Sequence, residues 1–283
     1  MRPYVFVVLS LVACGTSTGS SDAGPDASTG DAAFDAADAA AASDADAAVA
    51  APTVYACSAT TLYTFDPVAK SLAKVGAFNV GDGGAADAVT DIAVGLDGTI
   101  WAISSTKLYT VAPSDGHATV AGVLAACGSG SVALTALSNG KLYTADATGV
   151  VCSIDTTMMT DAPVGNVGGS LAVNDFVGLA DGTLYATAIS LGNTATQSNN
   201  LLITLDPATG AAKATIGSVG AGHLFGLAYA GGKALAFSHD GSGEVVAIDP
   251  TSGSGTPLGA FSDPDTHTPV TFVGAAVSPT VTP

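Results

Sequence analysis

From about residue 52 to the C-terminus, short apolar runs alternate with turn-forming residues. The runs are built from Val, Leu, Ile, Tyr, Phe and Thr, and they are bounded by Gly, Pro, Asp-Gly or Asn-Gly. Short runs rich in β-branched and aromatic residues between tight turns are typical of antiparallel strands. Helix signals are almost absent. The pattern therefore predicts an all-β domain.

Two kinds of turn recur along this domain. One follows an apolar strand and contains Pro, and the other is an Asp-Gly, Asn-Gly or Gly-Gly pair spaced 42 or 50 residues from the next. Recurrence at roughly 40 to 50 residues indicates a repeat architecture. The Pro-containing copies are LYTFDP at 62–67, LYTVAP at 108–113, LITLDP at 202–207 and VVAIDP at 245–250, and the paired turns are DGTIW at 97–101, NGKLY at 139–143, DGTLY at 181–185 and GGKAL at 231–235.

These turns predict the connections within one repeat. The paired turns put a residue that tolerates positive φ beside glycine, as a two-residue hairpin between the first two strands requires. The Pro-x-x-Gly ending suits a longer hairpin between the third and fourth strands, because Pro presets φ and Gly supplies a left-handed exit. Each repeat is therefore expected to hold four antiparallel strands.

Four strands per repeat at this period resembles a β-propeller blade. Complete repeats run over 89–124, 131–168, 174–219 and 223–261. A β-sandwich or jelly roll is the structural alternative, but neither predicts four similar consecutive repeats.

The two ends of the domain supply the parts of one more blade. The chain enters at Thr53 with a second, third and fourth strand, and 270–277 supplies only an innermost strand. The resemblance to propellers whose chain ends pair to lock the ring implies that these fragments complete one another. The prediction is a propeller of five blades of four antiparallel strands, with one blade closed by the N- and C-terminal strands.

The first 13 residues have the features of a secretion signal. Arg2 precedes an apolar run at 4–9 that is too short to span a bilayer. The tetrapeptide LVAC at 11–14 resembles the bacterial lipobox, whose cysteine is acylated and begins the mature lipoprotein. The resemblance implies a signal peptide over 1–13 and lipid attachment at Cys14. An ordinary secretion signal with a chance cysteine is the alternative.

Gly15 follows the expected lipid site. By the sorting rule that the lipoprotein resemblance brings with it, a residue other than Asp here favours the outer membrane. Residues 15–51 are almost wholly Ala, Asp, Ser, Thr and Gly, with seven Asp and no Lys or Arg. Such a stretch buries too little apolar surface to offset its ordering entropy, and like charges keep it extended. We therefore expect 14–51 to be a disordered, lipid-anchored tether and 52–283 to be the propeller domain.

The charge of the domain limits its partners. Residues 52–283 hold 17 acids and six lysines, and they contain no basic cluster. An acidic surface repels nucleic acid, so we expect no nucleic-acid partner. The expected partners are the membrane, through the lipid anchor, and a protein or glycan of the cell envelope. We expect the chain to be a monomer.

The innermost strands suggest one candidate metal site. Aligning Val94, Ala136, Gly178, Gly226 and Gly274 as equivalent places three potential ligands at one level of the ring, and carboxylates with an imidazole can hold a divalent cation such as calcium. Propeller lactonases, which the domain resembles in broad architecture, use a channel metal in this way. The alternative is that these residues only hydrogen-bond strand starts and channel waters, and that no cofactor is bound. The five aligned residues are Asp91, Ala133, Asp175, His223 and Thr271.

Three cysteines remain after Cys14. With the blade closed by the chain ends counted as the first, Cys127 falls in the link from the outermost strand of the second blade to the innermost strand of the third. Cys152 starts the third strand of that third blade, just beyond a turn. In a propeller, blade-to-blade links and the turns between second and third strands lie on one face. In a compartment that permits disulfides, we therefore expect a Cys127–Cys152 disulfide and a free Cys57.

Two functions remain compatible with the sequence. One is a non-catalytic, lipid-anchored binding scaffold at the cell surface or in the periplasm, with loops such as 191–200 and 262–269 available for contact. The other is a metal-dependent, lactonase-like hydrolase that uses Asp91, Asp175 and His223. No catalytic residue is identified on the first interpretation.

Overall fold

The computed structural model describes residues 52–80, 84–125, 127, 130–191 and 199–283. The expected signal peptide at 1–13, lipid site Cys14 and tether at 14–51 lie outside the described residues, as does most of the loop at 191–200. Within the described ranges, no helix is long and apolar enough to cross a membrane.

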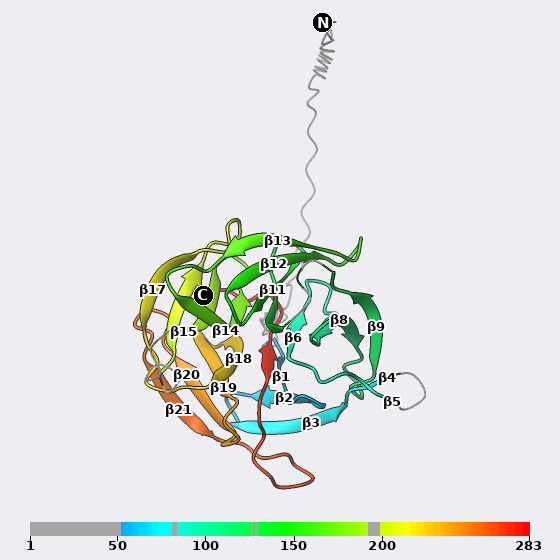
Figure 1. Ribbon diagram of the computed structural model, residues 1–283. Coiled ribbons are helices and arrows are strands. Elements are labelled where there is room, and N and C mark those ends of the chain that lie inside the picture. Colours follow the sequence, from blue (N-terminus) through cyan, green and yellow to red (C-terminus); the bar gives the residue numbers. More distant parts are fainter. Residues whose placement is uncertain (1–51, 81–83, 126, 128–129, 192–198) are drawn as a thin grey trace, which may run out of the picture. The chain divides into compact units, whose positions relative to one another are not determined.

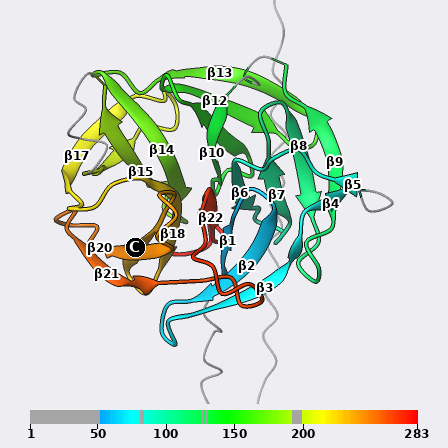
Figure 2. The same cartoon turned by 60° about the horizontal axis from the view of Figure 1, so that its bottom comes forward.

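Five antiparallel sheets surround a common centre as the blades of a propeller (Figures 1 and 2). The predicted all-β, five-bladed fold is confirmed. Blade 1 holds β22 (Gly274–Ala276), β1 (Val54–Cys57), β2 (Thr61–Asp66) and β3 (Ser71–Ala77); blade 2 holds β6 (Asp91–Val94), β7 (Ile100–Ile103), β8 (Lys107–Val111) and β9 (Ala118–Val123); blade 3 holds β10 (Ser131–Ala136), β11 (Leu142–Asp146), β12 (Val150–Asp155) and β13 (Thr160–Asn166); blade 4 holds β14 (Leu171–Gly178), β15 (Leu184–Ser190), β16 (Leu201–Leu205) and β17 (Ala212–Ser218); blade 5 holds β18 (Leu224–Ala230), β19 (Lys233–Ser238), β20 (Glu244–Ile248) and β21 (Gly255–Ala260).

Two short strands extend blade 2. β4 (Asn79–Val80) pairs in parallel with β9, and β5 (Gly84–Ala85) pairs antiparallel with β4. They belong to the link between blades 1 and 2.

The ring closes through the two ends of the domain. β22 is the innermost strand of blade 1 and pairs antiparallel with β1, opposing Gly274 to Cys57 and Ala276 to Tyr55. Figure 1 shows this last strand, in red, beside β1 at the centre of the ring. The closure predicted from the incomplete repeats is therefore present.

The repeated aspartates hold the turns in shape. Asp66 Oδ1 accepts hydrogen bonds from the backbone N–H groups of Val68 and Ala69, at 2.8 and 2.9 Å. This is an Asx-type turn, in which the carboxylate replaces a backbone partner. Asp155, Asp206 and Asp249 act in the same way after the third strands of blades 3, 4 and 5.

Glycines allow neighbouring blades to approach closely. The outer strand of each blade carries a bulge just before a glycine, as at Gly217 of β17. A Cβ at Gly217 would lie closer than 3.0 Å to the carbonyl oxygen of Ser252, in the Pro-x-x-Gly turn of the next blade. Gly253 ends that turn at φ 76°. Gly76 and Gly165 meet the turns at Asp115 and Thr209 in the same manner.

The junction of blades 5 and 1 is built differently. Gly259 of β21 faces Phe261 rather than the turn of blade 1. Phe65 contacts Phe261 and Phe237 edge to face, with ring centroids 5.1 and 5.4 Å apart, and Phe237 contacts Phe272 at 5.2 Å. An aromatic cluster thus replaces the glycine contact where the ring closes.

Candidate functional site

Two carboxyl groups from non-adjacent blades meet inside the ring. Asp91 of β6 and Asp175 of β14 are both fully buried, and their side chains hydrogen-bond to one another. We call these two residues the central acid pair. It includes two of the three residues that the sequence placed at a metal site.

Asp91 joins blade 2 to the blades on both sides. Its Oδ1 accepts the N–H of Ile92 at 2.7 Å, and its Oδ2 accepts the N–H of Leu134 in blade 3. The N–H of Ala275 in blade 1 also bonds to this carboxyl group. Gly274 leaves the space that the Asp91 side chain occupies, because a Cβ there would overlap Oδ1.

Asp175 performs the same task between blades 4 and 5. Its Oδ1 accepts the N–H of Phe176 at 2.6 Å, and its Oδ2 accepts the N–H of Leu227. Between blades 3 and 4, a hydroxyl replaces the carboxylate: the N–H of Gly178 donates to Thr135 Oγ1 at 3.0 Å. Side chains at the centre therefore satisfy backbone donors of neighbouring inner strands, as buried N–H groups require.

Burial controls the protonation of the central acid pair. Loss of hydration raises the pKa of both carboxyl groups well above the usual value, because a buried carboxylate is costly. The hydrogen bond between them lowers the pKa of Asp91 and raises that of Asp175, and the negative charge of Asp91 raises the pKa of Asp175 further. Both carboxyl groups therefore favour the protonated form, and the central acid pair keeps a proton at a pH where exposed carboxyl groups would have lost theirs.

The structure corrects the alignment that placed His223 and Thr271 with these acids. The strand pairing gives a reference point in each blade, namely the residue just before the turn after the third strand. In blade 4 this residue is Leu205, which pairs with Leu184, and Thr187, three residues beyond Leu184, pairs with Asp175. Counting the same way in blade 5 leads to Gly226, opposite Phe237, and in blade 1 to Gly274, opposite Cys57. The five equivalent residues are Asp91, Ala133, Asp175, Gly226 and Gly274.

The physical reason for the error is the first hairpin of blade 5. Gly231-Gly232 turns the chain directly after Ala230, which pairs with Lys233. In blade 4, by contrast, three further residues separate the end of β14 from Gly182. Matching glycine to glycine therefore shifted blade 5 by three residues. The correct ring combines two acids with three small residues, which leave room for the two carboxyl groups.

His223 lies away from the central acid pair. It directly precedes β18 and has a φ of 55°. Its side chain lines a hollow with Asn174, Ile189 and Phe225 and interacts electrostatically with Asp240. Among the residues that the structure describes, no three His, Cys, Asp or Glu side chains are placed to hold a metal ion. The structure therefore does not bring Asp91, Asp175 and His223 together as one ligand set.

The cysteines are arranged as expected. Cys127 and Cys152 form a disulfide with Cα atoms 6.2 Å apart, inside the range that the bond permits. Cys57 is free and buried on β1. Burial, followed by the charges of the central acid pair, raises the pKa of the Cys57 thiol well above its usual value, so it is neutral and unreactive.

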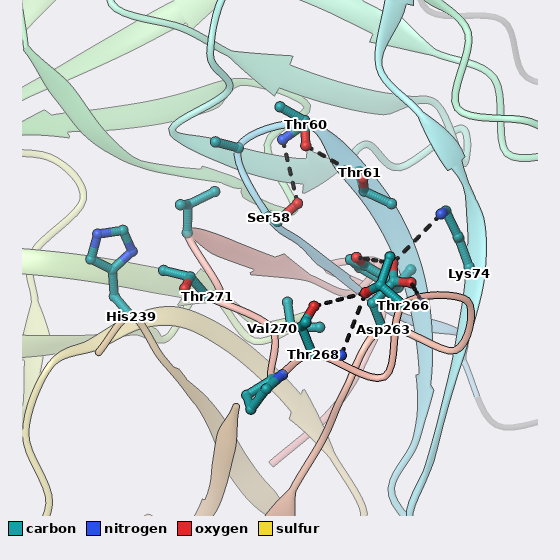
Figure 3. A pocket seen from close by; sticks show the side chains of 14 residues that line it. Ser58, Thr60, Thr61, Lys74, His239, Asp263, Thr266, Thr268, Val270 and Thr271 are labelled. Atoms are coloured by element: carbon teal, nitrogen blue, oxygen red, sulfur yellow. Dashed lines mark hydrogen bonds and ion pairs between the residues drawn. The ribbon is translucent and has the colours of Figure 1, made fainter. Parts of the chain in front are cut away.

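A polar surface hollow lies at the junction of blades 5 and 1. It is a hollow of about 420 Å³, which we call the seam hollow. Blade 1 contributes its β1–β2 turn and Lys74, blade 5 contributes His239, and residues 261–273 between β21 and β22, the closing segment, form the remaining wall. Figure 3 shows His239 and Lys74 on opposite sides of it. Six hydroxyl side chains line it: Ser58, Thr60, Thr61, Thr266, Thr268 and Thr271.

Asp263 anchors the closing segment. Its Oδ2 accepts the Tyr63 hydroxyl at 2.8 Å and lies 3.6 Å from Lys74 Nζ. Its Oδ1 accepts the N–H groups of Asp265 and Thr266, at 2.9 and 3.0 Å. These donors lower the pKa of Asp263 to about 2, with the Thr266 N–H contributing most and Tyr63 next. Residues 262–269, which the sequence predicted to be a loop available for contact, are therefore held against blade 1.

Sequence reasoning did not find the seam hollow. Half of its lining residues come from the closing segment, whose sequence does not repeat in the other blades. The available signal was Ser262 to Pro269, a polar stretch in a link longer than those between blades 2 and 3, 3 and 4, or 4 and 5. Its contact with Tyr63, 200 positions earlier, is visible only once the ring is closed.

Comparisons with known proteins extend only to the fold. No protein-family model matches the chain, and neither does any curated protein. Among solved structures, a chain of a nidogen/laminin complex is similar over 80% of this chain and 97% of its own, with 13% identity and a TM-score of 0.51. A Bacteroides thetaiotaomicron protein of unknown function matches 78% of this chain and 60% of its own, at 14% identity and a TM-score of 0.49. The similarity to the nidogen/laminin chain shows a shared fold and nothing about ligands.

Proposed function

We propose that this protein is a lipid-anchored envelope protein whose propeller is a non-catalytic binding scaffold. In this proposal, 1–13 is the signal peptide, Cys14 carries the lipid, 14–51 is the tether and 52–283 is the binding domain at the outer membrane. The partner is a protein or glycan of the envelope. No cofactor takes part, and the propeller acts as a monomer.

One observation carries the proposal. The acids that a channel hydrolase would need are buried and engaged with backbone N–H groups, whereas the seam hollow is accessible and lined by polar side chains from two blades and the closing segment. Polar groups that converge in a surface concavity on a rigid scaffold are typical of binding sites. The acidic domain also disfavours nucleic acid, by the charge argument above.

Fractionation and capture test the proposal together. Wild-type protein should partition into detergent, yield an acylated N-terminal peptide at Cys14 and retain an envelope component after extraction. Cys14→Ser should release or stall the protein, because firm anchoring depends on several acyl chains on this residue. Fully soluble wild-type protein with an unmodified N-terminus would contradict the anchoring, and failure to retain any envelope component would contradict the binding role.

A further inference from the structure

Charge within the seam hollow disfavours an anionic ligand. The Lys74 ammonium lies 2.8 Å from Asp265 and 3.6 Å from Asp263, so its charge is already paired. The full chain carries a formal charge of −17. An anionic ligand would meet the ionised Asp263 without a free cation to compensate it, and desolvating such a ligand is costly.

Hydrogen-bonding capacity in the hollow suits a polyol. Each Ser or Thr hydroxyl can both donate and accept, which complements hydroxyl groups that do the same. Thr271 is exposed, and its hydroxyl has no hydrogen-bond partner among the described residues. Figure 3 shows Thr271 between His239 and Val270.

His239 adds an acceptor of defined position. Its Nδ1 lies 2.9 Å from the carbonyl oxygen of Phe272. Because a carbonyl oxygen only accepts, Nδ1 carries the proton, and Nε2 of the neutral ring is left as an acceptor. The backbone fixes this residue as well, since the His239 N–H donates to the carbonyl of His223 at 2.7 Å.

The walls of the hollow are held in place without a ligand. In the closing segment, the N–H of Val270 donates to the carbonyl oxygen of Phe261 at 3.0 Å. The N–H of Phe272 donates to the carbonyl oxygen of Ser238 in blade 5 at 3.1 Å. Pro269 and Val270 add apolar surface beside the hydroxyls. A preformed site avoids part of the ordering cost of binding. Mixed hydroxyl and apolar walls match the polar edges and C–H faces of a sugar ring.

We propose that the seam hollow binds a neutral saccharide unit of an envelope glycan. This inference rests on the proposed binding function and specifies its ligand. It assigns Thr271 and His239 as specificity-determining residues at the closure of the ring.

The probe is a panel of soluble oligosaccharides, including neutral hexose and N-acetylhexosamine oligomers and their sialylated or phosphorylated counterparts. Full-length protein in detergent should bind at least one neutral oligomer. Thr271→Val keeps the shape and removes the free hydroxyl, and His239→Asn keeps a donor for Phe272 and removes Nε2. Each change should weaken binding about three- to tenfold, as expected for one lost hydrogen bond.

Thr215→Val on β17 is the matched control, because Thr215 is exposed and lies outside the hollow. It should leave affinity unchanged, and thermal melting should verify that all three variants fold. Binding that neither Thr271→Val nor His239→Asn alters would overturn the site, and so would a preference for charged oligomers or no binding to any neutral one. Retention of an envelope protein without saccharide binding would remove this inference and leave the scaffold proposal intact.

Discussion

Asp91 and Asp175 share a hydrogen bond across the centre of the ring, although blade 3 separates their blades. Each also accepts backbone N–H groups from a neighbouring blade. The two side chains therefore connect inner strands that the sheets themselves do not join. Because one proton is retained between them, their contribution to stability depends on pH.

The fold should become less stable as pH rises, because the folded protein favours a protonated Asp175. Its folded pKa is raised by burial and by Asp91, so the folded protein holds a proton that the unfolded chain releases above about pH 4. This stabilisation is complete below the unfolded pKa and is lost as pH rises towards the folded pKa. In Asp175→Asn the side chain does not titrate, and its NH2 group cannot accept one of the two N–H groups that Asp175 accepts, so the variant should be less stable at every pH. Chemical denaturation between pH 5 and 8 should show a steep decline for wild type and a shallower one for Asp175→Asn.

Asp263 provides the internal check on this assignment. The hydrogen bonds that lower the pKa of Asp263 to about 2 stabilise the fold fully above about pH 4, and this stabilisation is lost only as the pH falls towards 2. Asp263 therefore does not contribute to a change in stability between pH 5 and 8. Equal slopes for wild type and Asp175→Asn between pH 5 and 8 would show that the central acid pair does not retain a proton.

Glycines at the blade junctions should not be replaceable where the backbone of the next blade lies directly against them. Gly217→Ala would push Cβ into the Ser252 carbonyl, and we expect a loss of about 1–3 kcal/mol in the free energy of unfolding. Gly122→Ala is the matched control, because its Cβ would meet only the Met159 side chain, at 3.6 Å. Urea denaturation measures both. Similar losses in the two variants would contradict the close backbone contact.

Removing the last strand should open the ring. Deletion of 270–283 removes β22, leaves β1 without its inner partner and uncovers the Phe237 ring that Phe272 contacts. Unpaired strand edges promote aggregation, so we expect poor soluble yield and a much lower melting temperature. A truncated protein that melts like the full chain would mean that closure by β22 contributes nothing to stability.

The disulfide should be detectable by counting thiols. Denatured, unreduced mature protein should expose one alkylatable thiol, from Cys57, and Cys57→Ala should expose none. Reduction should cost about 3.5 kcal/mol, given the chain-entropy relation for a loop with a sequence separation of 25. Three alkylatable thiols in protein purified without reductant would exclude the bond.

Local patterns predicted the blades because the repeat is encoded locally. Asp-Gly and Pro-x-x-Gly turns fix hairpins within a few residues, and the incomplete blade at each end implied the closure. The central acids were also singled out, because aligning the innermost strands placed Asp91 and Asp175 at one level of the ring. The pairing of Cys127 with Cys152 followed from the face on which propeller turns lie.

The remaining features depend on register and on distant contacts. The turn at Gly231-Gly232 comes directly after β18, so glycine alignment misplaced His223, whereas counting from the Asp-Pro turns leads to Gly226. The seam hollow depends on the bond between Tyr63 and Asp263, which no local pattern encodes. Repeats thus predicted the scaffold, and the unrepeated closing segment determined the candidate site.

Elemental analysis of full-length protein, purified without chelator, tests the structural role of the central acid pair most directly. Because backbone N–H groups and the shared proton occupy these carboxyl oxygens, we expect wild type and Asp91→Asn alike to hold far less than one equivalent of any divalent metal. One equivalent of calcium or another divalent metal in wild type, lost in Asp91→Asn, would contradict this role and favour channel chemistry instead.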